Sequence, residues 1–220
     1  MSKFIVLEGT DGSGKATQLD LLCARLDDAG KKYTRLAFPR YDDPSSALLK
    51  MYLKGDFGSK PQDVNPYAAS TFFFVDRFAS FKTDWQQAYY NNEIIVADRY
   101  TTSNAIHQAG KLDGAEREDF LNWLFDFEYR LMGLPAPDMV IFLDMPAEYT
   151  FDLLKKRQGD EGDIHEKDHD YLKRCRENAV DVCQRYGWTR ISCVGERGLK
   201  KPEEISREIL AAAGEVLGLE

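Results

Sequence analysis

The segment FIVLEGTDGSGK, residues 4–15, decides the fold of this chain. Its apolar run over residues 4–7 predicts a buried strand, and a helix is predicted from Lys15 to Ala29, ended by Gly30. The glycines between them permit positive φ angles and let backbone N–H groups approach phosphate oxygens, while the helix N-terminus and Lys15 add positive potential. The segment therefore predicts a phosphate-binding loop. Its expected ATP-binding residues are Gly9, Thr10, Asp11, Gly12, Ser13, Gly14, Lys15, Ala16 and Thr17.

Ala16 departs from the usual pattern of such a loop. The pattern ends in Ser or Thr, whose hydroxyl normally holds Mg²⁺. Thr17 follows one place later, but one residue along a helix turns the side chain by about 100°. The metal must then be held by other groups, or the protein does not turn over.

Composition narrows the class of protein. The chain has 220 residues, of which 43% are hydrophobic, and we expect one domain spanning residues 1–220. A net charge of -8 argues against a polymeric nucleic acid as partner. The four cysteines form no CxxC pair, so structural roles are expected for them. The first apolar run is too short for a membrane span and follows no signal-peptide pattern, which predicts a cytoplasmic protein without a membrane partner.

Apolar runs alternate with helical patterns along the rest of the chain. This alternation predicts a parallel sheet covered by helices on both faces, with ligands at the carboxyl ends of the strands. Further strands are expected over residues 34–38, 94–97, 139–143 and 190–194. Further helices are expected over residues 45–53, 66–90, 103–110, 115–131, 146–157 and 167–186, with a last one from residue 202.

Charged and aromatic residues follow two of these strands. Asp98, Arg99 and Tyr100 come directly after the third strand. A carboxylate there suits Mg²⁺ or a proton, and a guanidinium grips phosphate with two donors; a surface ion pair is the alternative. The second strand ends in FPRY, residues 38–41, which offers another arginine and a phenol at the same edge.

The helix over residues 66–90 carries an aromatic run before Asp76-Arg77. At helical spacing Phe73 shares a face with Arg77, so a ring that stacks on a base would lie beside a hydrogen-bonding arginine. Aromatic residues in such a run are also common in a protein core, and that alternative stays open.

Taken together, these pieces resemble the thymidylate kinase family over nearly the whole chain. The matching stretches are GTDGSGK, FPRY, YAASTFFFVDR, ADRYTTSNA, FEYRLMGLPAPD and KKRQGDEGDIHEKD. The resemblance implies an α/β P-loop NTPase fold with a five-stranded parallel sheet, helices on both faces and a mobile lid at about residues 155–167. It also implies a homodimer that uses ATP with Mg²⁺ to convert dTMP to dTDP for dTTP supply.

The resemblance carries residue roles as well. Asp98 resembles the carboxylate beside the metal, acting through water, and Lys15, Arg99 and Arg157 resemble the family's catalytic cations. Within the acceptor site, Asp11 is similar to the carboxylate near the sugar hydroxyl. The resemblance implies that Phe73 stacks on thymine, that Arg77 and Asn104 contact the base, and that Arg99 and Tyr41 contact the phosphate. The full set of residues that it implies for dTMP binding is Asp11, Phe38, Arg40, Tyr41, Phe73, Arg77, Arg99, Tyr100 and Asn104.

The lid departs from the family pattern. Many relatives carry an arginine after the lid aspartate where this chain has Ile164, so Arg157 is expected to be the main lid cation.

Two other functions remain as alternatives. A deoxynucleoside kinase shares the fold and the phosphate loop, but its acceptor has no phosphate for the arginines to bind. A nucleotide-binding regulator without turnover has only Ala16 in its favour.

Overall fold

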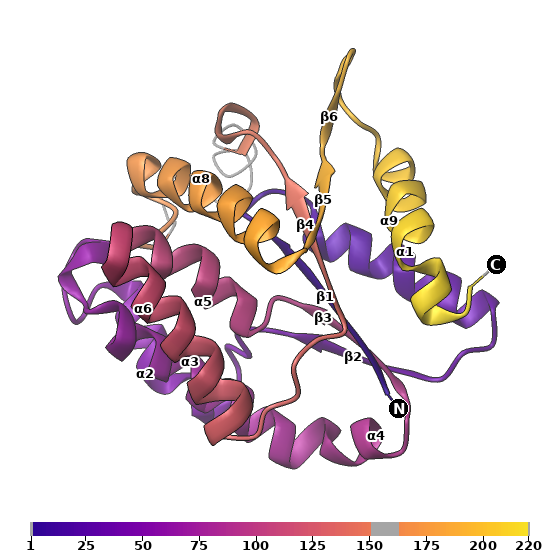
Figure 1. The fold of residues 1–220 in the computed structure, drawn as a ribbon, viewed down its shortest axis with the longest axis horizontal. Coiled ribbons are helices and arrows are strands. Elements are labelled where there is room, and N and C mark those ends of the chain that lie inside the picture. Colours follow the sequence, from indigo (N-terminus) through magenta and orange to yellow (C-terminus); the bar gives the residue numbers. More distant parts are fainter. Residues whose placement is uncertain (1, 151–162, 220) are drawn as a thin grey trace.

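A computed structural model describes residues 2–150 and 163–219 of the chain (Figure 1). At its centre lies a five-stranded sheet in the order β2-β3-β1-β4-β5, in which all neighbouring strands run parallel. The strands are β1 (Lys3–Gly9), β2 (Tyr33–Ala37), β3 (Ile94–Asp98), β4 (Met139–Asp144) and β5 (Thr189–Ser192). The five-stranded parallel sheet expected from the resemblance is confirmed.

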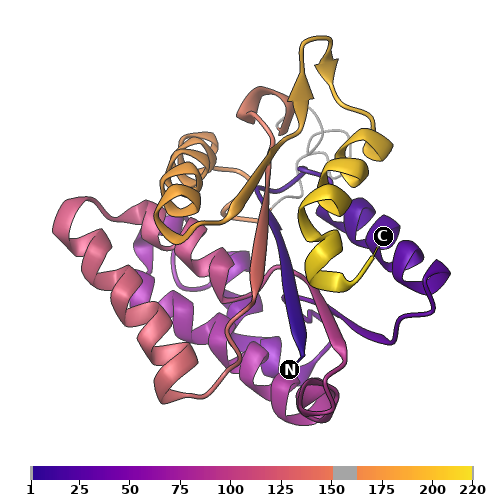
Figure 2. The same cartoon turned by 45° about the vertical axis from the view of Figure 1, so that its right-hand side comes forward.

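Helices cover both faces of this sheet. The α-helices are α1 (Lys15–Asp28), α2 (Ala47–Lys54), α3 (Pro66–Ser80), α4 (Gln86–Tyr90), α5 (Thr101–His107), α6 (Gly114–Phe125), α8 (His169–Tyr186) and α9 (Pro202–Leu217). Helices α1 and α9 lie on one face, whereas α3, α5, α6 and α8 lie on the other (Figures 1 and 2). None of the helices in residues 2–150 and 163–219 has the length and apolar character needed to cross a bilayer.

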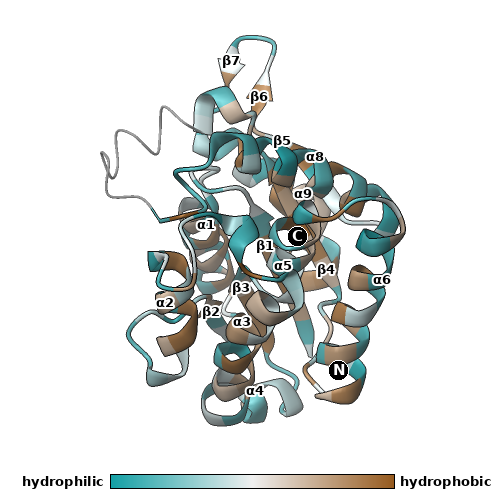
Figure 3. Cartoon of the chain, turned by 90° about the vertical axis from the view of Figure 1, so that its left-hand side faces the viewer, coloured by the Kyte–Doolittle hydropathy of each residue, from teal (hydrophilic) through white to brown (hydrophobic). Residues whose placement is uncertain are grey.

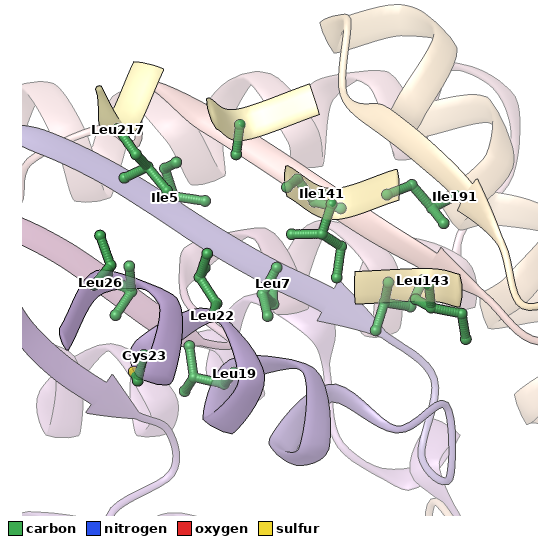
Figure 4. Close-up of a cluster of buried hydrophobic side chains, with 14 of the residues drawn as sticks. Ile5, Leu7, Leu19, Leu22, Cys23, Leu26, Ile141, Leu143, Ile191 and Leu217 are labelled. Atoms are coloured by element: carbon green, nitrogen blue, oxygen red, sulfur yellow. The ribbon is translucent and has the colours of Figure 1, made fainter. Parts of the chain in front are cut away.

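The alternation of side chains along β1 divides the core between the two faces. Ile5 and Leu7 point toward α1 and α9, where they pack with Leu19 and Leu22 (Figure 4). Phe4 and Val6 point the other way, into an aromatic cluster. Both faces of the central strand are therefore buried, as in other parallel sheets.

Most predicted elements form, and several differ in detail. The predicted helix over residues 66–90 contains a π-helical segment, Phe81–Trp85, and the one over 115–131 ends in another, Asp126–Leu131. Of the predicted helix over 146–157, residues 147–150 are helical and the remainder lies outside the described residues. The predicted strand over 190–194 stops at Ser192. A small antiparallel hairpin follows, formed by β6 (Val194–Gly195) and β7 (Gly198–Leu199), and it projects beyond the sheet (Figure 2).

Parallel pairing brings the ends of β1 and β3 to the same edge. Leu7 of β1 aligns with Asp98 of β3, so the phosphate loop and the turn after β3 start side by side. This edge is where ligands bind in open α/β sheets.

Candidate active site

A pocket of about 970 Å³ opens at this edge of the sheet. Residues of the phosphate loop line one part of the pocket, and residues of α3 and α5 line another. The described end of the predicted lid, residues 163–167, also borders the pocket. Its volume is in the range of known ligand sites.

The phosphate loop has the backbone expected for an anion site. Gly12 and Gly14 have φ angles of 78° and 86°, which other residues rarely adopt. The Lys15 ammonium donates to the carbonyl oxygens of Gly9 (3.0 Å) and Thr10 (3.1 Å). Burial first, and the nearby Arg99 charge second, lower the pKa of Lys15. The pocket is lined by Asp11, Gly12, Gly14, Lys15, Ala16 and Thr17, while Gly9, Thr10 and Ser13 lie behind this wall.

Arg99 joins the phosphate loop to the turn after β3. Its Nη2 donates to Asp11 Oδ1 at 2.6 Å, and its Nη1 donates to Ser103 Oγ at 3.3 Å. Burial would raise the pKa of Asp11, but the charges of Arg99 and Lys15 outweigh burial and hold that pKa well below its usual value. The ion pair fixes a cation in the wall of the pocket.

Asp98, the last residue of β3, has a carboxylate oxygen that is free to accept a further hydrogen bond or to bind a metal ion. Its Oδ1 is buried and has no hydrogen-bond partner among the described residues, although the side chain borders the pocket. A hard cation such as Mg²⁺ prefers a carboxylate oxygen of this kind and completes its shell with waters and phosphates. Across residues 2–150 and 163–219, no three His, Cys, Asp or Glu side chains gather to hold an ion on their own. The donor set thus fits a metal that arrives with nucleotide phosphates.

The part of the pocket lined by α3 and α5 contains the residues expected to contact a base. Phe73, Arg77 and Asn104 all border the pocket. Arg77 is buried and forms a bidentate ion pair with Glu128, through Nε at 2.9 Å and Nη2 at 2.5 Å. This pair uses two of its nitrogens and leaves Nη1 available for a ligand. Thr101 Oγ1 donates to the same carboxylate at 2.6 Å.

The segment after β2 divides into residues inside and outside the pocket. Phe38 and Tyr41 border the cavity, and so does Tyr100, although its ring is buried in the aromatic cluster. Arg40 does not border it. Its guanidinium donates to Asp76 (3.1 Å) and to Asp84 (2.5 Å), and these carboxylates hold it against α3. The structure thus gives Arg40 a role in fixing the loop.

Residues 163–167 border the pocket and are anchored by one apolar contact and two hydrogen bonds. Ile164 is buried among residues of α2 and α3, and its N–H donates to Leu53 O at 3.1 Å. His165 Nε2 and Tyr52 Oη are 2.7 Å apart. Ile164 therefore serves as a hydrophobic anchor for this segment. The predicted lid residues up to Gly162, Arg157 among them, lie outside the described residues.

Two histidines in the pocket were not predicted from the sequence. His107 and His165 are both buried, and their rings stack with centroids 5.9 Å apart. Burial, together with the neighbouring cations, lowers the pKa of His107 to about 3. His107 could have been found from its spacing, because it lies three residues after the predicted site residue Asn104 and so shares its helix face. His165 has no comparable signal.

Comparison with known proteins connects this site to a family. A family model described as thymidylate kinase matches residues 7–200. A thymidylate kinase of Mycobacterium tuberculosis is 32% identical over 175 residues, covering 77% of this chain and 80% of that protein. A probable thymidylate kinase of Pyrococcus horikoshii is 29% identical, covering 98% of each chain. One from Synechococcus is 30% identical, covering 93% of each.

Proposed function

Since the chain belongs to the thymidylate kinase family and phosphorylates dTMP, we propose that its pocket holds ATP over the phosphate loop and dTMP beside α3. The observation that carries this arrangement is the Arg99–Asp11 contact of 2.6 Å. It ties the phosphate loop to the turn after β3 and leaves one cation, Arg99, within reach of the phosphates of both ATP and dTMP. Lys15 supplies a second cation from the loop side.

On the acceptor side, we assign dTMP to the wall formed by α3 and α5. The Phe73 ring borders the pocket beside Arg77 and Asn104, which supply hydrogen-bond donors for the thymine edge. Tyr41 and Arg99 face the 5′-phosphate, and Asp11 faces the sugar hydroxyl. Phe38 and Tyr100 complete the wall, whereas Arg40 supports it from outside.

Phosphoryl transfer then needs positioning and charge more than covalent help from the protein. An oxygen of the dTMP phosphate attacks the γ-phosphorus of ATP, and the bond from that phosphorus to the bridging oxygen of ADP breaks. Lys15 and Arg99 hold the two phosphates in line and offset the charge spread over the transferring group. We assign the third cation to Arg157 of the lid.

Mg²⁺ is proposed as the cofactor despite Ala16. Asp98 would hold it through water, with the remaining ligands coming from ATP. When bound, the ion neutralises charge on the transferring phosphates. Asp98 itself orients the bound waters from the end of β3 and needs no hydroxyl at position 16.

A homodimer is supported by exposed apolar side chains on α3 and at the end of the π-helical segment η5 (Asp126–Leu131), here named the α3–η5 face: Val75, Phe78, Leu131 and Met132. These side chains are 44%, 37%, 57% and 40% exposed. Phe74 joins the two helices beneath it through a ring contact of 4.8 Å with Phe127. Exposed hydrophobic residues that lie near one another are typical of protein interfaces, and Figure 3 shows hydrophobic residues along α3. We propose that a second copy of this chain covers the α3–η5 face. We also propose that the protein is a cytoplasmic enzyme of nucleotide biosynthesis.

The test compares dTMP with thymidine as acceptor in an assay that couples ADP release to NADH oxidation. A nucleotide-binding site predicts turnover with dTMP and about 100-fold less or none with thymidine, because the arginines then lack their phosphate. Equal turnover would favour the deoxynucleoside kinase alternative, and no turnover with either would favour a regulator.

A further inference from the structure

Glu8 is a buried carboxylate that the proposed chemistry does not use. It is the penultimate residue of β1, and its side chain is fully buried. It occupies the same face of the strand as Phe4 and Val6, which are apolar core residues. A carboxylate in such a row is unfavourable unless its oxygens are hydrogen-bonded.

Among the described residues, the hydrogen-bond partners of the Glu8 carboxylate lie in the turn after β3 and in the first turn of α5. Its Oε1 accepts from the Tyr100 N–H at 3.1 Å and from Thr102 Oγ1 at 2.6 Å. Its Oε2 accepts from Ser103 Oγ at 2.8 Å. Burial raises the pKa of Glu8, while the Arg99 charge opposes that rise. One side chain of β1 therefore contacts both the turn after β3 and the start of α5.

The turn needs such a support because Arg99 has an unusual backbone. Its φ of 68° lies in the left-handed region, which is sterically disfavoured for a residue with a long side chain. The Arg99 N–H donates to Leu7 O at 3.0 Å, and the next N–H donates to Glu8. Ser103 Oγ adds a side-chain link, because it contacts both Glu8 and Arg99 Nη1. Consecutive residues of β1 thus fix consecutive residues of the turn.

We propose that Glu8 is a positioning residue for the acceptor phosphate: it holds the turn in the conformation that directs the Arg99 guanidinium into the pocket. The proposal rests on the assignment of Arg99 to that phosphate. Glu8 touches neither substrate. It acts through the Tyr100 N–H and the Ser103 hydroxyl, so its effect falls on the phosphate part of dTMP and spares the nucleoside part.

The test measures Kd for dTMP and for thymidine by isothermal titration calorimetry in the wild type and in Glu8→Gln. The amide keeps the size of the side chain but presents only one acceptor oxygen to the turn. We expect dTMP to bind about 10-fold more weakly or worse, with thymidine within about 2-fold, because the loss of orientation acts on the phosphate. Equal weakening of both ligands, or of neither, would overturn the proposal.

Two further variants separate the possible failures. Arg99→Gln must also lose the preference for dTMP over thymidine; if it keeps that preference, the assignment of Arg99 is wrong and the proposal falls with it. If Arg99→Gln loses the preference but Glu8→Gln keeps it, only the role of Glu8 is wrong. Should Glu8→Gln not fold, Ser103→Ala is measured instead, with the same direction of change expected and the same overturning outcomes.

Asp138→Asn serves as the matched control. Asp138 accepts the Phe4 N–H at 2.7 Å and so ties down the opposite end of the same strand. It lies away from the pocket. This variant is expected to keep the wild-type ratio of the two dissociation constants. A ratio that shifts as much as in Glu8→Gln would mean that loosening β1 anywhere has the same effect, which would overturn a specific role for Glu8.

Discussion

At the residue scale, the unpartnered oxygen of Asp98 gives the sharpest expectation about the metal. The oxygen is buried beside the phosphate loop and has no protein donor among the described residues. Asp98→Asn keeps the shape but removes the charge that orients metal-bound water. We expect kcat to fall at least about 100-fold, because phosphoryl transfer depends on fixed charge. Steady-state kinetics check this value, and near wild-type turnover, or full turnover in excess EDTA, would contradict it.

Arg77 has a structural role as well as its proposed role at the base. Arg77 and Glu128 are both buried, and they are joined by two hydrogen bonds. Arg77→Met should destabilise the fold by about 3–5 kcal/mol, because it leaves a buried carboxylate without its partner. Adding Glu128→Met should recover much of the loss. Urea denaturation of the two variants measures this, and a loss below about 1 kcal/mol in Arg77→Met would refute a tight buried pair.

At the element scale, Asp163 in the segment of residues 163–167 makes the free energy of unfolding depend on pH. Burial raises the pKa of Asp163 from 3.8 to about 7, and the Glu166 and Asp11 charges add to the rise. The folded state therefore binds this proton more tightly than the unfolded chain does. Its contribution to stability is fully present below about pH 4 and is lost as the pH rises to about 7.

Asp163→Asn removes this dependence and keeps the acceptor oxygen. That oxygen receives the N–H groups of His165 (2.8 Å) and Glu166 (3.0 Å). We expect the Tm of the variant, relative to the wild type, to rise between pH 5 and pH 8. Thermal melts at the two pH values measure the difference. A constant difference, or one that falls with pH, would be inconsistent with a raised pKa at this position.

The main elements could be predicted because their signals are local. The apolar run of β1, the glycines after it and the helical pattern from Lys15 are contiguous, so they identify the strand, loop and helix. The β6–β7 hairpin could not be found, because its two-residue strands are too short to show alternation. The π-helical turns at Phe81–Trp85 and Asp126–Leu131 change the backbone hydrogen bonding but barely change the spacing of apolar residues, so the sequence pattern does not reveal them.

The site was predictable to the extent that it follows strand ends. Asp98 and Arg99 border the pocket, as expected for residues that follow a strand, because parallel strands end at the same edge of the sheet. The Arg99–Asp11 contact joins residues 88 positions apart, and the Arg40 network with Asp76 and Asp84 depends on how α3 packs. Such contacts are set by tertiary structure, which the sequence pattern does not specify.

At the scale of the whole molecule, the α3–η5 face predicts the oligomer. A dimer should have twice the 25.1 kDa mass of the chain, measured by light scattering after gel filtration. Phe78→Asp should shift the mass to that of a monomer, because a charge buried in an apolar interface is strongly unfavourable. Tyr90→Asp, which alters an exposed aromatic residue on α4, should leave the mass unchanged. A wild-type monomer, or a Phe78→Asp dimer, would speak against this face as the interface.

The central claim is that one pocket joins ATP to a thymine nucleotide. It is tested most directly by kcat/KM for dTMP, dCMP, dGMP and AMP, measured as nucleoside diphosphate formed from ATP and separated by chromatography. A wall built from Phe73, Arg77 and Asn104 leaves buried groups unpaired with any other base. We predict that dTMP exceeds each of the others by about 100-fold or more. Equal kcat/KM for dTMP and AMP would contradict the account.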